Sequence, residues 1–448
     1  MASAEPPGRD DDPVNRDTIA AIATPAGRGG IGVVRISGPA VSTIASKILG
    51  ALPAPRHAGF ARFRNARGEP IDEGLALYFP APHSYTGEMV LELQGHGGQV
   101  VMQALLRACL DAGARLAEPG EFTRRAFLEG RLDLAQAEAV ADLIDASSEE
   151  AARAALRSLS GEFSSAIQAL ASQLVELRAL TEAMLDFPEE ELDTVHREDA
   201  RARLARAQRQ LDDVLAKSRE GSLLRSGIHV VLAGRPNVGK SSLLNRLAGE
   251  ERAIVTPIAG TTRDALREPI QIQGVPLTLV DTAGLREASD TIEQLGMERT
   301  HSELARADLV LLVEEAGKPA PPPVGLASGA QRTVVYNKLD LAPQFKPPAG
   351  AVAVSAKTGQ GLEDLRAAIL AAAGWSSTGE SVFLARERHL RALESARGHL
   401  DAARGELAQW EFFAEELRLA HAALGAITGE FTADDLLGQI FSRFCIGK

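Results

Sequence analysis

Gly234-Arg-Pro-Asn-Val-Gly-Lys-Ser241 stands just past the middle of the 448-residue chain and fits the phosphate-binding pattern G-x-x-x-x-G-K-[ST]. The β-branched run before it, 228–233, is typical of a buried parallel strand, and the run after it, 242–248, has helical spacing. Such a loop turns backbone N–H groups and a helix N-terminus toward an anion. We therefore expect phosphates here, with Lys240 reaching the outer ones and the Ser241 hydroxyl ligating Mg²⁺. A glycine turn with a stray lysine is the alternative.

Two further segments follow in the order that a GTP-binding domain needs. Gly260-Thr-Thr-Arg-Asp264 stands where a first switch loop supplies a threonine to Mg²⁺. Asp281-Thr-Ala-Gly284 follows a predicted strand at 277–280. Asp281 would join the Mg²⁺ shell through water, and the Gly284 N–H would contact the γ-phosphate.

Two more segments indicate guanine. Asn337-Lys-Leu-Asp340 follows a predicted strand at 333–336, and Ser355-Ala-Lys357 follows another at 351–354. The Asp340 carboxylate can accept hydrogen bonds from the guanine N1–H and N2 amine, a pair of donors that adenine does not offer. The second segment would support the base through a backbone N–H. An isolated N-K-x-D is more often a solvated turn, but all these segments in order, each after a strand, predict GTP binding.

The residue after the D-x-x-G segment raises the question of how GTP is hydrolysed. Many GTPases orient the attacking water with a glutamine there, and Leu285 cannot do this. The stretch that follows carries three carboxylates, Glu287, Asp290 and Glu293, in a predicted loop that runs into a helix. On the residues alone, either one of them holds the water or the stretch is a solvated acidic loop.

Composition is that of an ordinary globular protein. The chain is 45% hydrophobic and 24% charged, and its two cysteines imply no disulfide framework, which favours a reducing, cytoplasmic setting. No apolar run approaches the length of a membrane span, so we expect no membrane. The net charge of −12 argues against a mainly electrostatic nucleic-acid binder, although a local basic face is compatible with it. The arginine-rich stretch 201–225 is either such a face or, the interpretation we favour, the polar side of an amphipathic helix.

The length suits about three domains. Residues 1–16 are polar and proline-rich and predict a disordered tail, whereas residues 17–129 alternate strand-like and helix-like runs and predict a small α/β domain. Residues 130–222 and 377–448 are predicted to be helical and flank an α/β P-loop GTPase (G) domain at 223–376. We therefore predict a multidomain chain in which the G domain is inserted into one helical domain.

Several strings carry a resemblance to one family. They are Ala23-Thr-Pro-Ala-Gly-Arg-Gly-Gly-Ile-Gly-Val-Val-Arg-Ile-Ser-Gly38, Ser84-Tyr-Thr-Gly-Glu-Met-Val-Leu-Glu-Leu-Gln-Gly-His-Gly-Gly98, Pro119-Gly-Glu-Phe-Thr-Arg-Arg-Ala-Phe127, Arg131-Leu-Asp-Leu-Ala-Gln-Ala-Glu-Ala139, Asp281-Thr-Ala-Gly-Leu-Arg-Glu287 and the terminal Phe444-Cys-Ile-Gly-Lys448. Outside the nucleotide segments, GTPases in general share none of them. On these strings the chain resembles the MnmE (TrmE) tRNA-modification GTPases from Asp17 to its last residue.

The resemblance implies a potassium-activated GTPase that acts on the wobble uridine of certain tRNAs as a homodimer, together with an FAD-binding partner, MnmG (GidA). The pair would add an aminomethyl or carboxymethylaminomethyl group at uracil C5. The one-carbon unit would come from 5,10-methylene- or 5-formyl-tetrahydrofolate. GTP binding would close two G domains and hydrolysis would reopen them. A ribosome-assembly or translation GTPase that binds RNA is the alternative, and a folate enzyme with a regulatory G domain is a third hypothesis.

The resemblance also places a folate site in the N-terminal domain, which would mediate dimerisation. By position in the matching strings, Arg35, Glu92 and Arg131 would contact the folate, with Lys448 nearby. A carboxylate such as Glu92 can pair with the amide and amino groups of a pterin, and arginine suits the carboxylates of a folate tail. An exposed strand residue is the alternative for Glu92. Cys445 is a candidate at the tRNA site, as a nucleophile for uridine C6, as a structural residue or as a mere neighbour.

Family resemblance further implies how hydrolysis proceeds without a glutamine. K⁺ would lie where an arginine finger places its charge, ligated by the Asn237 side chain and by the backbone carbonyls of Thr256, Ile258 and Thr261. Thr262 and the phosphate-loop serine would ligate Mg²⁺.

The resemblance also implies which residues catalyse hydrolysis and which residues surround the nucleotide. Glu293 would orient the water and would act with Lys240 in catalysis. Pro257 is a departure, because an acidic residue is common at this place in the potassium loop. The residues expected around GTP are Asn237, Val238, Gly239, Lys240, Ser241, Ser242, Thr256, Pro257, Ile258, Ala259, Gly260, Thr261, Thr262, Asp281, Thr282, Ala283, Gly284, Asn337, Lys338, Asp340, Ser355, Ala356 and Lys357.

Overall fold

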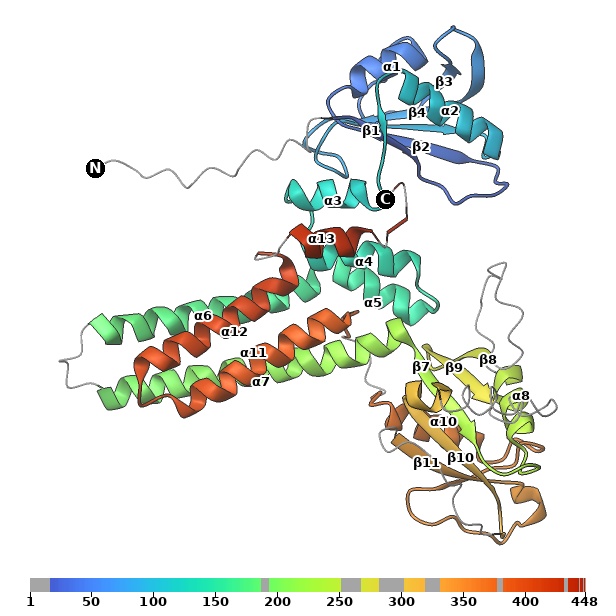
Figure 1. Cartoon of the computed structure of the whole chain (residues 1–448), viewed down its shortest axis with the longest axis vertical. Helices are drawn as coiled ribbons and strands as arrows, with labels where there is room; N and C mark the ends of the chain where they lie inside the picture. The colour runs from blue at the N-terminus through green and yellow to red at the C-terminus, as the bar shows by residue number, and fades with distance from the viewer. Residues whose placement is uncertain are drawn as a thin grey trace. The chain divides into compact units, whose positions relative to one another are not determined.

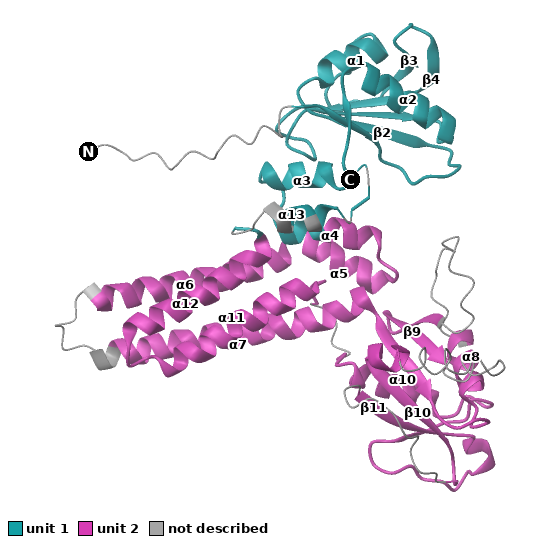
Figure 2. Ribbon diagram, in the orientation of Figure 1, with its two compact units in different colours: residues 1–138, 429–448 teal, residues 139–428 magenta. Residues whose placement is uncertain are grey.

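The chain divides into two compact units in a computed structural model that describes residues 17–186, 193–250, 267–281, 302–318, 331–376, 382–430, 434–442, 444, 445 and 447. One unit comprises residues 1–138 and 429–448, and the other comprises residues 139–428 (Figure 2). The last segment of the chain therefore belongs with the first. The boundaries at 129, 222 and 376 stay predictions, because this division does not separate those parts.

The first unit is built on a six-stranded sheet in the order β3-β4-β5-β2-β1-β6 (Figure 1). Neighbouring strands are antiparallel except β1 and β6, which are parallel. Successive side chains of a strand point to opposite faces, so each long strand contributes one row to each face. The strands are β1 (Ile19–Ile22), β2 (Gly32–Ser37), β3 (Gly59–Arg64), β4 (Pro70–Phe79), β5 (Val90–Gly95) and β6 (Arg115–Leu116).

Helices cover the two faces of this sheet unequally. Helices α1 (Val41–Leu49) and α2 (Gln99–Asp111) pack on one face, over a core that includes the fully buried Phe63 and Leu91. Helix α3 (Glu121–Leu128) lies on the other face at its β1 end, where Phe122 packs against Ile19 and Ala21. Among the described residues of this unit, α3 covers the β1 end of the second face and leaves the β3 end exposed.

The end of the chain completes this unit. Helix α13 (Asp434–Phe441) packs on α3, with the rings of Phe441 and Phe127 centred 6.4 Å apart. The buried Phe444 follows, with its ring 5.4 Å from that of Phe441. A methyl group added at Gly120 would come within 2.7 Å of the Phe441 carbonyl oxygen, so the two segments touch closely. The sequence pattern alone groups this segment with the helical residues 377–448, and that boundary stays a prediction.

Four long helices form a bundle in the second unit (Figure 2). An apolar stripe over 382–428 is packing surface, since Leu393, Leu400, Leu417 and Leu424 are buried. The stripe belongs to two helices, because the chain leaves the helical conformation at 406–409. The bundle helices are α6 (Glu162–Asp186), α7 (Asp193–Ser226), α11 (Glu387–Gly405) and α12 (Trp410–Thr428), preceded by α4 (Leu134–Ile144) and α5 (Glu149–Leu159).

Basic residues of α7 form the polar side of that helix. Arg203 and Lys217 each pair at 2.9 Å with an aspartate one turn earlier, and Arg219 and Arg225 pair with Glu394 and Asp142. The interpretation of 201–225 as the polar face of an amphipathic helix is therefore supported. None of the helices in the described ranges is long and apolar enough to cross a bilayer.

The G domain stands between α7 and α11 in the chain, so the predicted insertion is confirmed. Its sheet has the order β12-β11-β10-β7-β9-β8, with every neighbouring pair parallel except β8 and β9. The carboxyl ends of the parallel strands therefore meet at one edge. The elements are β7 (Ile228–Ala233), α8 (Lys240–Glu250), β8 (Arg267–Ile272), β9 (Val275–Asp281), β10 (Leu309–Glu315), β11 (Gln331–Asn337), η2 (Leu339–Leu341), β12 (Val352–Ala353) and α10 (Leu362–Ala372).

Candidate functional site

The glycine-rich loop joins β7 to α8, as the sequence predicts. Its two glycines have φ angles of +155° at Gly234 and +93° at Gly239. A methyl group on Gly234 would lie 2.3 Å from the Val313 carbonyl oxygen, and one on Gly239 would lie 2.4 Å from Asn337 Nδ2. Glycine is therefore required at both places, because the backbone conformation and the neighbouring atoms exclude a side chain.

Lys240 holds the loop from within. It is the first residue of α8 and only 5% exposed, and its Nζ donates to the carbonyl oxygens of Gly234 and Arg235, both at 3.0 Å. The helix N-terminus and the ammonium thus face the same side of the loop. This arrangement concentrates positive potential where a phosphate would bind.

Ser241 and Asp281 bring oxygen ligands together from two elements. The Ser241 hydroxyl in the first turn of α8 donates to Asp281 Oδ2 at the end of β9, at 2.6 Å. Mg²⁺ prefers oxygen ligands and keeps several waters in its shell. The pair therefore fits the expected magnesium site, with the hydroxyl as a direct ligand and the carboxylate able to bind through water.

Asn337 connects the N-K-x-D segment to the phosphate loop. This buried last residue of β11 donates from Nδ2 to the Val238 carbonyl oxygen at 3.0 Å, and its Oδ1 accepts from the Ala356 N–H at 3.0 Å. The amide therefore fixes the phosphate loop and the Ser355–Lys357 segment in relation to each other.

The carboxylate of Asp340 is held in place by the fully buried Ser355. The Ser355 hydroxyl donates to Asp340 Oδ1 at 2.6 Å and accepts from the Thr358 N–H at 3.2 Å. A carboxylate has about four acceptor positions, so this bond leaves capacity for the two donors of a guanine edge. The structure thus brings the phosphate loop, the N-K-x-D segment and the Ser355–Lys357 segment to one edge of the sheet.

Several predicted residues lie outside the described part of the chain. They are the switch and potassium-loop positions Thr256, Pro257, Ile258, Ala259, Gly260, Thr261 and Thr262, the positions Thr282, Ala283 and Gly284, and Glu293. The other predicted nucleotide residues are described. Asn237 is exposed at the loop, with a left-handed φ of +65°, and Ser242 and Lys357 are exposed as well.

A second candidate site lies on the first unit, at the expected folate residues. Arg35 and Glu92 stand opposite each other on β2 and β5, and Arg35 Nε donates to Glu92 Oε1 at 2.9 Å. The guanidinium lies 5.5 Å from the ring centre of Tyr85 and 5.8 Å from that of Phe122. These distances suit cation–π contacts. The Arg35 Nη1 also donates to the Gly447 carbonyl oxygen at 3.4 Å, so the end of the chain reaches this site.

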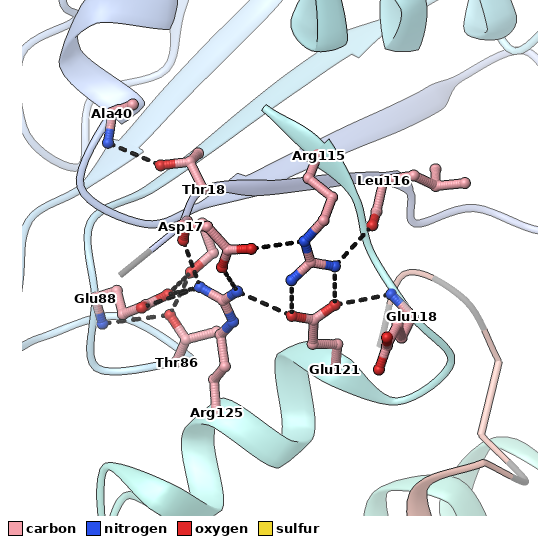
Figure 3. A network of polar contacts seen from close by, with 11 residues as sticks. Asp17, Thr18, Ala40, Thr86, Glu88, Arg115, Leu116, Glu118, Glu121 and Arg125 are labelled. Carbon is pink, nitrogen blue, oxygen red and sulfur yellow. Dashed lines mark hydrogen bonds and ion pairs between the residues drawn. The ribbon is translucent and has the colours of Figure 1, made fainter. Parts of the chain in front are cut away.

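Helix α3, which supplies one of these rings, is fixed by a network of ion pairs (Figure 3). The buried Arg125 bonds to Asp17 at 2.6 Å, to Glu121 at 2.9 Å and to Glu88 at 3.2 Å. Arg115 bonds to the same Asp17 at 2.6 Å and to Glu121 at 2.7 Å. The two guanidinium groups therefore share Asp17 and Glu121, and Arg125 also holds Glu88. The network joins α3 to the segment before β1, to β6 and to the loop before β5.

The charged forms of these groups are stabilised. Burial alone would raise the pKa of Glu121, but hydrogen bonds from Arg115, the Glu118 N–H and Arg125 outweigh it and lower the pKa below its usual value. The same balance lowers the pKa of Asp17. Burial opposes the charge of Arg125, yet its bond to Glu121 and the nearby Glu88 raise its pKa. Asp17, Glu121 and Arg125 are therefore ionised at neutral pH.

The remaining predicted residues of this site are less closely joined. Arg131 is exposed just after α3, and its Cγ would lie 3.4 Å from a methyl group at Gly87. No described contact joins it to the Arg35–Glu92 pair. Cys445 is exposed, and its carbonyl oxygen accepts from the Gly120 N–H at 3.4 Å. Lys448 lies outside the described residues.

The aromatic partners of Arg35 were not predicted. Tyr85 and Phe122 both belong to strings that carry the family resemblance, but nothing in a linear sequence shows that their rings meet one guanidinium. The Tyr85 hydroxyl is hydrogen-bonded to Thr123 Oγ1 at 2.8 Å, and burial raises the pKa of Tyr85.

Comparison with known proteins agrees with these features. The MnmE helical domain matches residues 134–445, and the N-terminus of the GTP-binding protein TrmE matches residues 18–131. The chain is also 60% identical over 443 residues to the tRNA modification GTPase MnmE of Azoarcus sp. (strain BH72), with 96% of this chain and 98% of that protein covered. The chain belongs to the MnmE family.

A second relative gives the same result. The MnmE of Thiobacillus denitrificans is 58% identical over 441 residues, which cover 97% of this chain and 99% of that protein. Among solved structures, the G domain of the T. maritima FeoB iron transporter is 27% identical and covers 33% of this chain and 98% of its own, with a TM-score of 0.26. Membership of the MnmE family, with the nucleotide-binding elements described above, makes this chain a GTP hydrolase.

Proposed function

We propose that this MnmE-family GTPase uses K⁺-activated GTP hydrolysis to drive modification of the wobble uridine of certain tRNAs. It would work with an FAD-dependent partner, MnmG (GidA), in the cytoplasm. Together they would add an aminomethyl or carboxymethylaminomethyl group at C5, with the one-carbon unit taken from 5,10-methylene- or 5-formyl-tetrahydrofolate. The observation that carries the proposal is one chain with both a guanine-nucleotide site and a separate Arg35–Glu92 site.

The G domain supports the hydrolytic part of the proposal. Lys240 would stabilise the outer phosphates, and Ser241, Thr262 and the carboxylate of Asp281 would hold Mg²⁺, which would neutralise charge developing on the phosphates. Asn237 projects from the same loop in a left-handed conformation, where its amide oxygen could serve K⁺. Thr256, Ile258 and Thr261 would add their backbone carbonyl oxygens, and Glu293 would orient the attacking water.

The Arg35–Glu92 pair supports the folate part. Both side chains keep about a fifth of their surface exposed, at 21% and 17%, so a ligand can reach them. The carboxylate has a second oxygen and the guanidinium has further N–H donors, so the pair can recognise the donor and acceptor edge of a pterin. Arg131 and Lys448 would serve the anionic tail of the folate. Cys445 stands in the same terminal segment, as a candidate at the tRNA site.

An exposed apolar pair on the sheet supports a homodimer. Phe60 and Leu75 stand opposite each other on β3 and β4 and are 70% and 40% exposed. By strand alternation they lie on the same face as Arg35 and Glu92, at the end that α3 leaves uncovered. A second copy of the chain would bury them beside the site.

Mass spectrometry of wobble uridines in a deletion strain tests the function. We expect the C5 modification to vanish on deletion, to return with the unaltered gene and to stay absent with Glu92→Gln, whose protein should still hydrolyse GTP. Asp111→Asn, which alters an exposed carboxylate at the end of α2 on the opposite face of the sheet, is the matched control and should restore modification. If wobble uridines of the deletion strain kept their C5 modification, the result would contradict the proposal and favour a ribosome-assembly or translation GTPase.

A further inference from the structure

Glu315 stands at the nucleotide edge of the G-domain sheet. It is the last residue of β10 and lies beside Asn337, the last residue of β11, in the parallel register. The following Ala316 N–H donates to the Asn337 carbonyl oxygen at 2.8 Å, which keeps the two strand ends together. On its other side β10 pairs with β7, the strand that leads into the phosphate loop. Ligands of open α/β sheets bind at this edge.

The Glu315 carboxylate divides its two oxygens between two lysines. Oε2 bonds to Lys338 Nζ at 3.0 Å, and Oε1 bonds to Lys318 Nζ at 2.6 Å. Glu315 and Lys338 are 20% and 29% exposed, whereas Lys318 is 74% exposed. The bond to Lys338 is therefore the more sheltered, and Lys318 offers an exposed comparison on the same carboxylate.

Lys338 lies in the N-K-x-D segment of the guanine site, with a left-handed backbone conformation. It lies between Asn337, which holds the phosphate loop, and Asp340, which would read the base edge, and its φ is +64°. A free lysine side chain loses rotamer entropy when it becomes ordered. If its ammonium is already fixed by a carboxylate, its methylene stem is ordered before a ligand arrives and can cover the apolar face of a base.

We propose that Glu315 is a positioning residue for guanine nucleotides, which acts by fixing Lys338 beside the base. The proposal rests on the guanine-nucleotide site described above. An exposed ion pair contributes little to stability. If the Glu315–Lys338 bridge were only such a surface pair, its loss would leave nucleotide affinity unchanged. A bridge that orders Lys338 instead stabilises the bound state, and its loss weakens binding of GDP and GTP.

A double-mutant cycle on the full chain tests the proposal, with Kd measured by titration of a fluorescent GDP. Glu315→Gln should raise Kd by about 3- to 10-fold, a typical cost of lost preorganisation. Lys338→Met should raise it by at least as much. Adding Glu315→Gln to Lys338→Met should cause no further loss, because the carboxylate then has no Lys338 to fix. Glu315→Asp, which keeps the charge, should retain part of the affinity.

Two controls separate this role from a structural one. Lys318→Met removes the exposed partner and should leave Kd within about twofold of the unaltered chain. Steady-state turnover of Glu315→Gln should show a larger change in KM than in kcat. An unchanged Kd for Glu315→Gln, or equal losses with and without Lys338, would overturn the proposal. Failure of the unaltered chain to bind GDP would instead contradict the GTPase function itself.

Discussion

In the nucleotide site, single side chains both hold backbone segments in place and face the position of the ligand. The Lys240 ammonium bridges two loop carbonyls, and Asn337 joins three segments through one amide. Ser355 in turn fixes the carboxylate that would read guanine. Because each group is preorganised, a nucleotide would find its partners largely in place, and less binding energy would be lost in ordering them.

Substitution of Asn237 tests the potassium hypothesis. Asn237→Gly removes the side-chain oxygen, and glycine tolerates the left-handed φ of +65°. We expect GDP affinity within about threefold of the unaltered chain, whereas the ratio of GTP turnover in KCl to that in NaCl should fall toward one. An unchanged KCl-to-NaCl ratio would remove Asn237 from the site. Equal turnover of the unaltered chain in both salts would show that K⁺ does not activate hydrolysis.

Substitution of Glu293 tests the water-orienting role. Glu293→Ala should keep nucleotide affinity, because this residue would act on the attacking water and not on the bound nucleotide. Turnover should fall by about 100-fold or more, as expected when a group that orients or activates the nucleophile is lost. Glu287→Ala, in the same acidic stretch, is the matched control. A Glu293→Ala protein with normal turnover would return the choice to Glu287 or Asp290.

Helix α3 is held by buried charged groups. Its Glu121 and Arg125 are 5% and 2% exposed and share a network with Asp17, Glu88 and Arg115. Removal of one partner from a buried network leaves another charge without compensation. Because α3 also places Phe122 under Arg35, damage to the network would reach the candidate folate site.

Glu121→Gln should destabilise the first unit by about 3 kcal/mol, since it removes one buried charge opposite two guanidinium groups. Hydrogen exchange read by peptide should show lost protection in β1 and α3 but not in β7 or α8. Glu129→Gln, at an exposed position just after α3, should change stability by no more than about 0.5 kcal/mol. Equal protection in the two variants would mean that the network does not hold the helix.

The same pair of proteins gives a pH prediction. The folded-state pKa of Glu121 lies below its ordinary value of 4.5, so its contribution is complete above that value and is lost as the pH falls through the folded pKa. The stability difference between the unaltered chain and Glu121→Gln should therefore be constant near neutrality and shrink in acid. The intrinsic rate of amide hydrogen exchange depends on pH. The two proteins are therefore compared with each other at each pH, where that rate is the same for both. A difference that grew in acid would reverse the sign and contradict this assignment.

Sequence predicted the nucleotide elements better than the others. The run 228–233 coincides with β7, because its apolar residues are bounded by glycines whose conformations the loop requires. No helix was predicted at 41–49 and no strand at 59–64. Helix α1 does carry a helical pattern, since Val41, Ile44, Ala45 and Ile48 are its buried residues, whereas β3 buries only one side chain fully and depends on packing within the sheet unit. The partners of Arg35 could not be foreseen, because strand register and the placement of α3 bring them together only in the fold.

Across the whole molecule, chain order and spatial grouping differ. The G domain is inserted between two bundle helices, and residues 429–448 return to the unit that begins the chain. A helical pattern shows that α13 is a helix, but it cannot show on which unit the helix packs. The contact is made by aromatic rings of α3, α13 and the terminal segment, which local periodicity does not connect.

Phe444→Ala tests how much the terminal segment contributes. Phe444 is 6% exposed, so its truncation should destabilise the first unit by about 3 kcal/mol or more. Unfolding followed by tryptophan fluorescence should change little, because Trp375 and Trp410 both lie in the second unit. Phe412→Ala, at a 56% exposed position, is the matched control and should leave peptide protection in the first unit unchanged. Unchanged protection in Phe444→Ala would show that the unit is complete without the tail.

The return of α13 to the first unit also has a consequence during synthesis. The strands of that unit leave the ribosome early, but the helix and the Phe444 ring that cover α3 are made about 300 residues later. At about 5–20 residues per second, the interval is on the order of tens of seconds. Throughout that time the nascent sheet unit exposes the apolar surface that its final residues will bury. A chain released early would keep this surface exposed, and chaperones or proteases could distinguish it from the finished protein.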